Sequence, residues 1–339
     1  MLRPHLSLFF LVVVLCAPRT RLFPEAVHVM MAVYNTEEYL PHALDSIFAQ
    51  THPDFHLIVY NDGSKDRCAK ILERYQRQYP EKMSLYGSRT NRGTAFARQV
   101  LMDRSLERSQ EALSVWLDSD DAFKDRDFLR AFEEQMERSQ ADVCLFSFSL
   151  RLEDPEQKAN LNGLLEERAA NEALFASIRK GPNEALAPYK IPGLAQIFSM
   201  GGFKGYRNTV KWPKPLPCLF EDFVYMSVLW NAEKITALPP SYRPVEYLRR
   251  ASSSTGQRTA QSFLDVLAQL RRFIECIDPE RRILQKHATY AFVERKATQY
   301  ADLLEMLVSS AEHPNITEKT LTRYREEREN LLKFARFPE

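Results

Sequence analysis

The sequence is poor in glycine and lacks the glycine-rich signatures of common nucleotide-binding folds. Only 10 of its 339 residues are glycine, and no G-x-G-x-x-G motif or other glycine-rich phosphate loop follows the first predicted strand. Such glycines let the backbone approach a pyrophosphate closely. Their absence argues against a dehydrogenase. It also disfavours a nucleotidyltransferase, which would likewise combine an α/β sheet, two carboxylates and a metal.

An excess of charge of one sign is also missing. Lys and Arg number 46 against 45 Asp and Glu, so the chain has no overall basic field to hold a nucleic-acid backbone. We therefore expect no nucleic-acid partner. The five cysteines form no C-x-x-C pair, which argues against a zinc site and a disulfide framework and favours buried thiols in a reducing compartment.

The apolar run near the N-terminus is too short to span a bilayer as a helix. Residues 6–17, LSLFFLVVVLCA, follow Arg3 and His5 and have the length of the apolar segment of a secretory signal. A signal peptide, an apolar membrane-surface anchor and residues upstream of the true start all stay open. We expect a cytoplasmic location, with membrane association and export left open.

From Val27 onward, short β-branched runs alternate with amphipathic stretches. This spacing is typical of successive βα units in a largely parallel sheet. Strands are predicted at 27–33, 55–60, around 85, 113–117 and 143–150, with helices over 40–48, 65–79 and 94–107 between them. The sequence therefore predicts an α/β fold with a mostly parallel sheet flanked by helices.

Three regions follow from this pattern. Residues 1–24 form the apolar segment, 25–250 the α/β domain, and 251–339 a helical appendage predicted as three helices, because no glycine follows Gly256. Within the α/β domain, residues 153–190 are polar and helix-prone and are expected to form an insertion or lid.

The strongest local signal is Asp118-Ser119-Asp120-Asp121, at the end of a predicted buried strand. Three carboxylates so close together repel one another unless a cation or hydrogen-bond donors neutralise them. Mg2+ or Mn2+ binds one or two protein carboxylates together with phosphate oxygens, which suits a diphosphate substrate. A solvated loop that caps the helix beginning near Asp127 is an equal alternative on these residues alone.

Two further polar residues follow predicted strands. Asp62, in Asn61-Asp62-Gly63-Ser64, could accept a hydrogen bond from a base N–H, but an Asx turn or capping of the next helix is favoured for this residue taken alone. Tyr34 could stack on the same base or belong to the core. In open α/β sheets, ligands bind outside the carboxyl ends of the strands, where both residues fall.

Charged residues in two later segments complete the candidates. Arg98 faces inward on its predicted helix and is a better phosphate ligand than Arg92, which is more typical of a surface arginine. Glu221-Asp222 precedes an apolar helical face. A carboxylate there could act as a general base, although helix capping is the favoured interpretation of the pair by itself.

The combination resembles the family 2 glycosyltransferases of the GT-A type. The resemblance rests on five blocks in order: VHVMMAVYNTEEYL, LDSIFAQT, DFHLIVYNDGSKD, NRGTAFAR and WLDSDD. It is close over 27 to about 125 and thinner beyond, where Glu221-Asp222 and the segment 247–250 also look like family motifs. The chain departs from the family at Asn61, where Asp is common, and at Val33, where Pro is common. No His matches the further metal ligand of some members.

The resemblance implies a donor site. Val33 and Tyr34 would border the base, Asp62 would bind its edge, and Arg98 would help hold the donor.

It also implies a metal and a base. Asp118 and Asp120 would form the DXD motif that contacts ribose and Mn2+ or Mg2+, with Asp121 as an alternative ligand, and Asp222 would be the catalytic base. The implied activity is inverting transfer from a nucleotide-sugar, a UDP-sugar in the first place, to a glycan or glycolipid acceptor, with peripheral membrane contact left open. The alternative is a catalytically silent sugar- or nucleotide-binding scaffold of the same fold.

Overall fold

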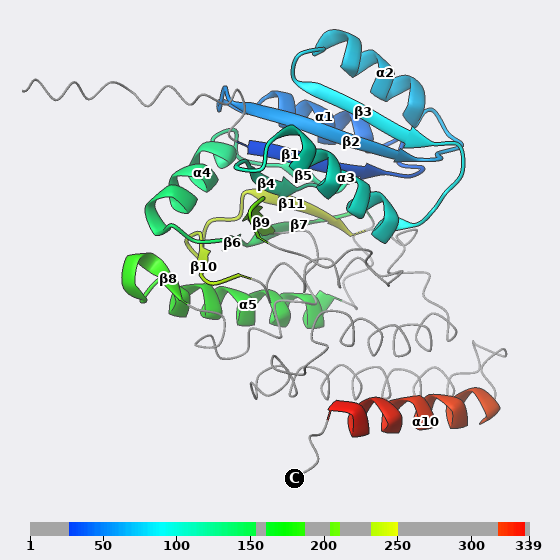
Figure 1. The fold of residues 1–339 in the computed structure, drawn as a ribbon, viewed down its shortest axis with the longest axis vertical. Coiled ribbons are helices and arrows are strands. Elements are labelled where there is room, and N and C mark those ends of the chain that lie inside the picture. Colours follow the sequence, from blue (N-terminus) through cyan, green and yellow to red (C-terminus); the bar gives the residue numbers. More distant parts are fainter. Residues whose placement is uncertain (1–26, 154–160, 187–203, 211–231, 250–317, 336–339) are drawn as a thin grey trace, which may run out of the picture.

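The computed structural model describes residues 27–153, 161–186, 204–210, 232–249 and 318–335. Two sheets form the centre of this part (Figure 1). The larger has the strand order β3-β2-β1-β4-β9-β6-β10-β8. Its strands, in chain order, are β1 Val27–Val33, β2 Phe55–Asp62, β3 Met83–Ser88, β4 Leu113–Trp116, β6 Val143–Leu145, β8 Ala185–Leu186, β9 Lys204–Arg207 and β10 Ile235–Ala237. The smaller sheet pairs β11 Val245–Arg249 with β5 Ala122–Phe123 and β7 Phe148–Leu152.

The larger sheet is parallel in its first half and mixed in its second. Strands β3, β2, β1 and β4 all run parallel, as the βα spacing predicts. Strand β9 then runs antiparallel to both of its neighbours, β4 and β6, and β8 runs antiparallel to β10. The expectation of a mostly parallel sheet thus holds for the half that contains β1.

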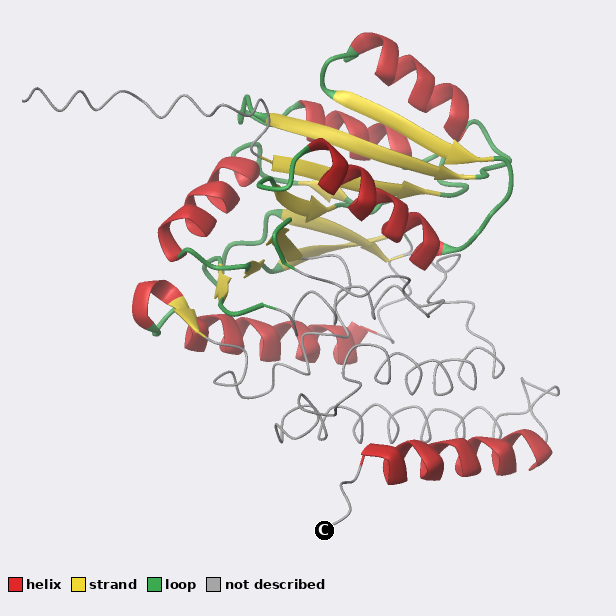
Figure 2. Ribbon diagram, in the orientation of Figure 1, coloured by secondary structure: helices red, strands yellow, loops and turns green. Residues whose placement is uncertain are grey.

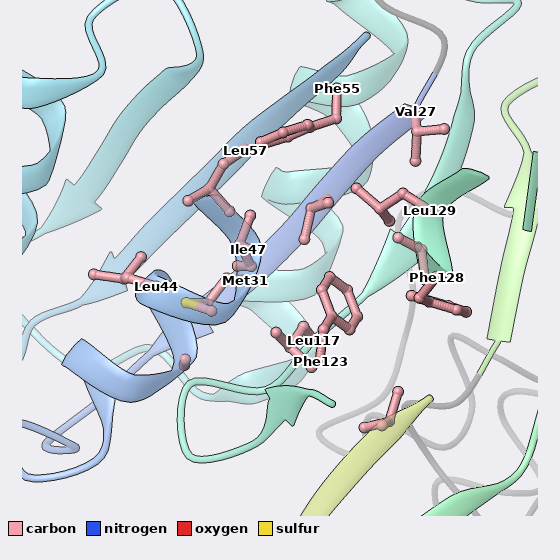
Figure 3. Packing of buried hydrophobic residues seen from close by; sticks show 14 of the residues in the cluster. Val27, Met31, Leu44, Ile47, Phe55, Leu57, Leu117, Phe123, Phe128 and Leu129 are labelled. Carbon is pink, nitrogen blue, oxygen red and sulfur yellow. The ribbon is translucent and has the colours of Figure 1, made fainter. Parts of the chain in front are cut away.

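Helices cover both faces of this parallel half. The cluster of buried residues on one face joins β1 and β2 to α1 Leu40–Phe48, α2 Cys68–Gln78 and α4 Phe128–Ser139. Figure 3 shows Leu44 and Ile47 of α1 beside Met31 of β1. Helix α3 Thr94–Arg108 packs on β1 and β2 from the other face, where His28 bonds to Ser105.

Burial on both faces explains the composition of these strands. In β1, VHVMMAV, six of seven residues are buried, because successive side chains point to opposite faces and both faces are covered. Fully burying one aliphatic side chain such as Leu44 contributes roughly 1.5–3 kcal/mol. The strands are therefore rigid supports for the loops at their ends.

The region after α4 differs from its prediction in one respect. The single strand predicted at 143–150 is two strands, β6 and β7, which belong to different sheets because the chain changes sheet at Phe146 and Ser147. The predicted helix within 153–190 is confirmed as α5 Leu161–Ile178, which packs against β10 and so forms part of the layered structure (Figure 2).

Only one helix of the expected C-terminal appendage lies within the described residues, α10 Glu318–Ala335. The other two predicted helices and the boundary at 250/251 fall outside them, as does the apolar segment 1–24. In the part of the chain that the structure describes, no helix combines the length and apolar character needed to cross a membrane.

Candidate functional site

The site is assembled where three neighbouring parallel strands end. Strand β1 lies between β2 and β4, and Val33 at its end pairs with Asn61 of β2. On the other side, the backbone N–H of Leu117, just after β4, donates to the carbonyl oxygen of Met30. The chain passes from β1 to β2 in one direction along the sheet and reaches β4 in the other. The gap between β1 and β4 is therefore a topological switch point, where ligands of open α/β sheets bind.

The loop after β1 is tied to the loop after β2. Asn35 adopts a left-handed backbone conformation, with φ of 51°, which an asparagine tolerates better than most residues. Its backbone N–H donates to the Ser64 hydroxyl at 3.2 Å, and its side-chain oxygen accepts from the backbone N–H of Lys65 at 2.8 Å. These bonds hold the ends of β1 and β2 together.

The same loop is tied to the acidic segment after β4. The hydroxyl of Thr36 donates to the hydroxyl oxygen of Ser119 at 2.9 Å, and both side chains are buried. The backbone N–H of Thr36 also contacts the Sγ of Cys68, at the start of α2, at 3.3 Å. The predicted convergence of the three polar clusters at one sheet edge is therefore what the structure shows.

The acidic segment is a tight turn, and its successive residues alternate between partly exposed and buried. In this acidic turn, residues 118–121, the backbone N–H of Asp121 donates to the carbonyl of Asp118 at 3.0 Å. The side chains of Asp118 and Asp120 are partly exposed, whereas those of Ser119 and Asp121 are buried. A ligand that arrives from solvent therefore meets Asp118 and Asp120 first.

Asp121 is directed away from that exposed side. Its Oδ1 accepts a hydrogen bond of 2.9 Å from the backbone N–H of Leu248 in β11. Burial, together with the nearby charges of Asp120 and Asp118, raises the pKa of Asp121 well above its ordinary value, although the Leu248 N–H opposes this. Asp121 thus joins the acidic turn to the smaller sheet. None of the described hydrogen bonds supports the alternative in which the turn caps α4.

Arg98 contacts the acidic turn directly. It lies in the second turn of α3, is 2% exposed, and places Nη2 2.9 Å from Oδ1 of Asp118. Its guanidinium carbon lies 5.1 Å from the centre of the Trp116 ring. The expectation that Arg98 faces inward is confirmed. Arg92, by contrast, is exposed and lies over the Phe96 ring, as expected of a surface arginine.

Asp62 holds the loop that leads into α3. Its two carboxylate oxygens accept hydrogen bonds from the backbone N–H groups of Arg92 at 2.9 Å and Gly93 at 2.8 Å. The Asx-type contact in the loop after β2 is made by the neighbouring Asn61, whose side-chain oxygen accepts from the Ser64 N–H. Gly63 has a φ of 72°, and an added Cβ would lie 2.5 Å from the carbonyl carbon of Thr90, so glycine is required there.

The two residues at the end of β1 differ in exposure. Tyr34 is 43% exposed, which excludes the alternative that it belongs to the core. The side chain of Val33 is packed in the core cluster, so only its backbone is available to border a ligand. Tyr34 is therefore the side chain of this pair that can contact a base.

Glu221 and Asp222 lie outside the described residues, so the structure does not place the expected general base. Among the residues that are described, no group of three or more His, Cys, Asp or Glu side chains is arranged to hold a metal ion. The described part can thus offer a cation at most two accessible carboxylates from the acidic turn, Asp118 and Asp120.

Residues that sequence reasoning missed connect these candidates. Leu248 acts through its backbone N–H, and Tyr247 beside it has its pKa raised to about 12 by burial and by the charge of Asp121, with Arg249 opposing. The motif at 247–250 signals that this segment matters, but neither a backbone donor nor the Thr36–Ser119 bond has a signature in the sequence. The fold and this site define an α/β protein with an open mixed sheet, whose polar candidates lie at the switch point between β1 and β4.

Comparison with known proteins gives the family. The sequence model of "Glycosyl transferase family 2" matches residues 28–205, more than half of the chain. The teichuronic acid biosynthesis glycosyltransferase TuaG of Bacillus subtilis is 33% identical over 123 residues, which are 36% of this chain and 45% of TuaG. The chain spans less than half of the length of such curated relatives. It belongs to glycosyl transferase family 2.

Solved structures agree on the fold. TarS of S. aureus matches with a TM-score of 0.56 at 16% identity, covering 91% of this chain and 54% of TarS. GalNAc-T7, crystallised with UDP, GalNAc and Mn2+, matches with a TM-score of 0.51 at 12% identity, covering 90% of this chain and 54% of that protein. The predicted GT-A architecture, a large sheet flanked by helices, is confirmed. The comparison does not test the C-terminal appendage.

Proposed function

We propose that this chain transfers a sugar from a nucleotide-sugar, a UDP-sugar in the first place, to a hydroxyl of a glycan or glycolipid acceptor, with inversion at the anomeric carbon. The observation that carries the proposal is the convergence of Tyr34, Asp62, Asp118 and Asp120 at the switch-point edge of the sheet. The structural neighbours TarS and GalNAc-T7 have been crystallised with UDP-GlcNAc and with UDP, respectively, which supports a uridine nucleotide.

The base of the donor would lie over Tyr34 and against Asp62. Tyr34 offers an exposed ring for stacking. An ionised carboxylate has about four acceptor positions, and the Arg92 and Gly93 N–H groups occupy two at Asp62. Asp62 therefore keeps acceptor capacity for a base N–H while it holds the loop before α3. The backbone of Val33 would border the same base.

A divalent cation, Mn2+ or Mg2+, would bind at Asp118 and Asp120. Two partly exposed carboxylates suit a hard cation that completes its shell with water and donor phosphates. Asp118 would also reach the ribose, as in the DXD motif of the family. Asp121, buried and bonded to Leu248, is the less suitable ligand. When bound, such a cation would stabilise the negative charge that develops on the departing nucleoside diphosphate.

Asp222 would supply the general base. Its carboxylate would take the proton of the acceptor hydroxyl while that oxygen attacks the anomeric carbon from the side opposite the diphosphate. One displacement inverts the configuration, and no covalent sugar intermediate is formed. Residues 25–250 would form the catalytic domain. Relatives named for teichuronic and teichoic acid biosynthesis support a cell-surface polymer or its lipid-linked precursor as acceptor.

The test is a panel of UDP- and GDP-sugars offered to the full chain with Mn2+ and with chelator, with released nucleotide as the readout. We expect metal-dependent turnover of at least one UDP-sugar. Asp222→Asn should keep UDP binding and lose turnover by several orders of magnitude. Near-normal turnover in that variant would remove Asp222 from the role of base. A wild-type chain without affinity for any nucleotide would favour the silent scaffold instead.

A further inference from the structure

Arg98 forms an ion pair with Asp118, the first residue of the acidic turn, and the two side chains differ in exposure. Nη2 of Arg98 lies 2.9 Å from Oδ1 of Asp118, but the arginine side chain is 2% exposed and the aspartate side chain 32% exposed. The pair thus has a buried cation and an anion that is open to solvent on one side. A donor that approaches from solvent can reach the aspartate without displacing it, whereas the guanidinium lies behind it.

The sheet explains why the guanidinium is held in this place. Trp116 is the last residue of β4, and Asp118 follows it by two residues, the spacing that returns a strand side chain to the same face. That face is covered by α3, which carries Arg98. The guanidinium lies 5.1 Å from the Trp116 ring centre while it donates to Asp118. A planar guanidinium can stack and donate at once, which a lysine ammonium cannot do equally well.

The start of the same helix is fixed by Asp62. The N–H groups of Arg92 and Gly93, immediately before α3, both donate to the Asp62 carboxylate. A negative charge near a helix N-terminus is also favoured by the helix dipole. Helix α3 is therefore attached at its start to the loop after β2 and, through Arg98, to the turn after β4.

Desolvation makes the pair interdependent. A buried guanidinium without a counter-charge is strongly disfavoured, and Asp118 supplies negative charge to Arg98 at 2.9 Å. Conversely, the acidic turn holds three carboxylates within four residues, and like charges so close together repel one another. A fixed positive charge next to Asp118 reduces this repulsion and restricts the rotamers of Asp118 before any ligand arrives.

We propose that Arg98 is a positioning residue, which fixes the carboxylate of Asp118 from beneath and does not itself bind the donor diphosphate. The pair uses Oδ1 of a partly exposed carboxylate, which leaves its second oxygen for ribose or cation. This role deepens the proposed function and rests on it for the identity of the ligand. It replaces the direct donor contact that family resemblance implies for Arg98.

The pairing is tested first by thermal melting of the full chain in four forms: wild type, Arg98→Met, Asp118→Asn and the double variant. Each single substitution removes one charge of the pair and its attraction to the other, so both should lower the melting temperature. The double variant removes both charges and should recover part of the loss. Losses that simply add in the double variant would overturn the pairing.

The positioning role is tested by titration calorimetry with UDP and Mn2+. Arg98→Lys should weaken UDP binding about 10-fold in the wild-type background and less than about 2-fold in the Asp118→Asn background, because its effect passes through Asp118. An equal 10-fold loss in both backgrounds would mean direct phosphate contact and would overturn the proposal. Arg104→Lys, on the same helix but paired with Glu107 at the surface, is the matched control and should bind UDP normally.

The two proposals fail in different ways. A wild-type chain that binds no UDP contradicts the proposed function. The melting cycle still decides, without any ligand, whether Arg98 and Asp118 are coupled as the structure places them.

Discussion

The hydroxyl of Thr36 donates to the hydroxyl oxygen of Ser119 across 83 positions of sequence, joining the loop after β1 to the acidic turn after β4. Both side chains are buried, so neither can replace this partner with bulk water. This buried bond therefore helps to fix the position of the acidic turn relative to Tyr34 and its neighbours.

Thr36→Val tests this bond. Valine keeps the shape but leaves the Ser119 oxygen buried without this donor, so the free energy of unfolding should fall by about 1–3 kcal/mol. Urea denaturation measures it. Thr36→Val combined with Ser119→Ala removes both polar groups and should be less destabilised than Thr36→Val alone. Thr209→Val, at an exposed threonine after β9, is the control. An unchanged stability in Thr36→Val would show that the bond is unimportant.

Asp62→Asn should weaken uridine binding more than it weakens the fold. The amide has a single, uncharged acceptor oxygen, so it loses one of the two backbone N–H partners and becomes a weaker acceptor for a base N–H. Hydrogen bonds to charged groups contribute about 1.5–3 kcal/mol, which corresponds to a loss of roughly 10-fold or more in uridine affinity.

Calorimetry with uridine, which carries no phosphate, isolates this contact from the metal site. Asp54→Asn, exposed at the opposite end of β2, serves as the control. Uridine affinity that is the same in Asp62→Asn and wild type would remove Asp62 from the base site.

Two conservative substitutions can distinguish which carboxylates of the acidic turn bind the cation. Asp120→Asn should abolish the effect of Mn2+ on UDP affinity, because it removes an exposed carboxylate from the proposed metal site. Asp121→Asn should retain that effect, because its amide oxygen can still accept from the Leu248 N–H. The reverse pattern, with metal dependence lost only in Asp121→Asn, would place the cation one residue later than proposed.

The contacts of Glu172 in α5 predict that the stability of the folded protein depends on pH. Its carboxylate accepts from Ser147 at 2.6 Å and from Arg243 Nε at 2.8 Å, which links α5 to the segments before β7 and β11. Burial alone would raise its pKa, but the hydrogen bonds from Arg243 and Ser147 and the arginine charges outweigh it and lower the pKa below the ordinary value of 4.5.

A lowered folded-state pKa contributes stability that is present above the unfolded value and is lost as the pH falls through the folded one. Glu172→Gln should therefore be destabilised by about 1–2 kcal/mol at pH 7. The difference from wild type should shrink once the pH falls below 4.5. Urea denaturation at several pH values measures this, and a difference that stays constant down to low pH would show that the carboxylate charge is irrelevant.

The sequence predicts the first half of the fold because the local signals there are long and periodic. Strands such as Val27–Val33 are bounded by turn residues and buried on both faces, and α3 was expected at nearly its observed limits. The second half could not be predicted in the same way. Strands β8, β9 and β10 are two to four residues long, too short to show a period, and their pairing depends on tertiary contacts.

For the candidate site, too, some residues can be predicted from the sequence and others cannot. The sequence offers Asp62, Arg98, Asp118 and Asp120 as candidates, and the family resemblance implies their roles. In the structure, Asp62, Asp118 and Asp120 lie at or just after the ends of neighbouring parallel strands, and Arg98 reaches Asp118 from α3. Their partners were not identified, because the bonds from Gly93 to Asp62 and from Leu248 to Asp121 connect residues 31 and 127 positions apart through backbone N–H groups that every residue type except proline carries.

The most direct test of the proposed donor site is calorimetric titration of UDP into the full wild-type chain with Mn2+ and again with EDTA. Because Asp118 and Asp120 are proposed to bind the cation that holds the diphosphate, UDP should bind at least about 10-fold more tightly with Mn2+, a difference of about 1.4 kcal/mol. Equal UDP affinity with and without the metal, or no UDP binding in either condition, would contradict the assignment.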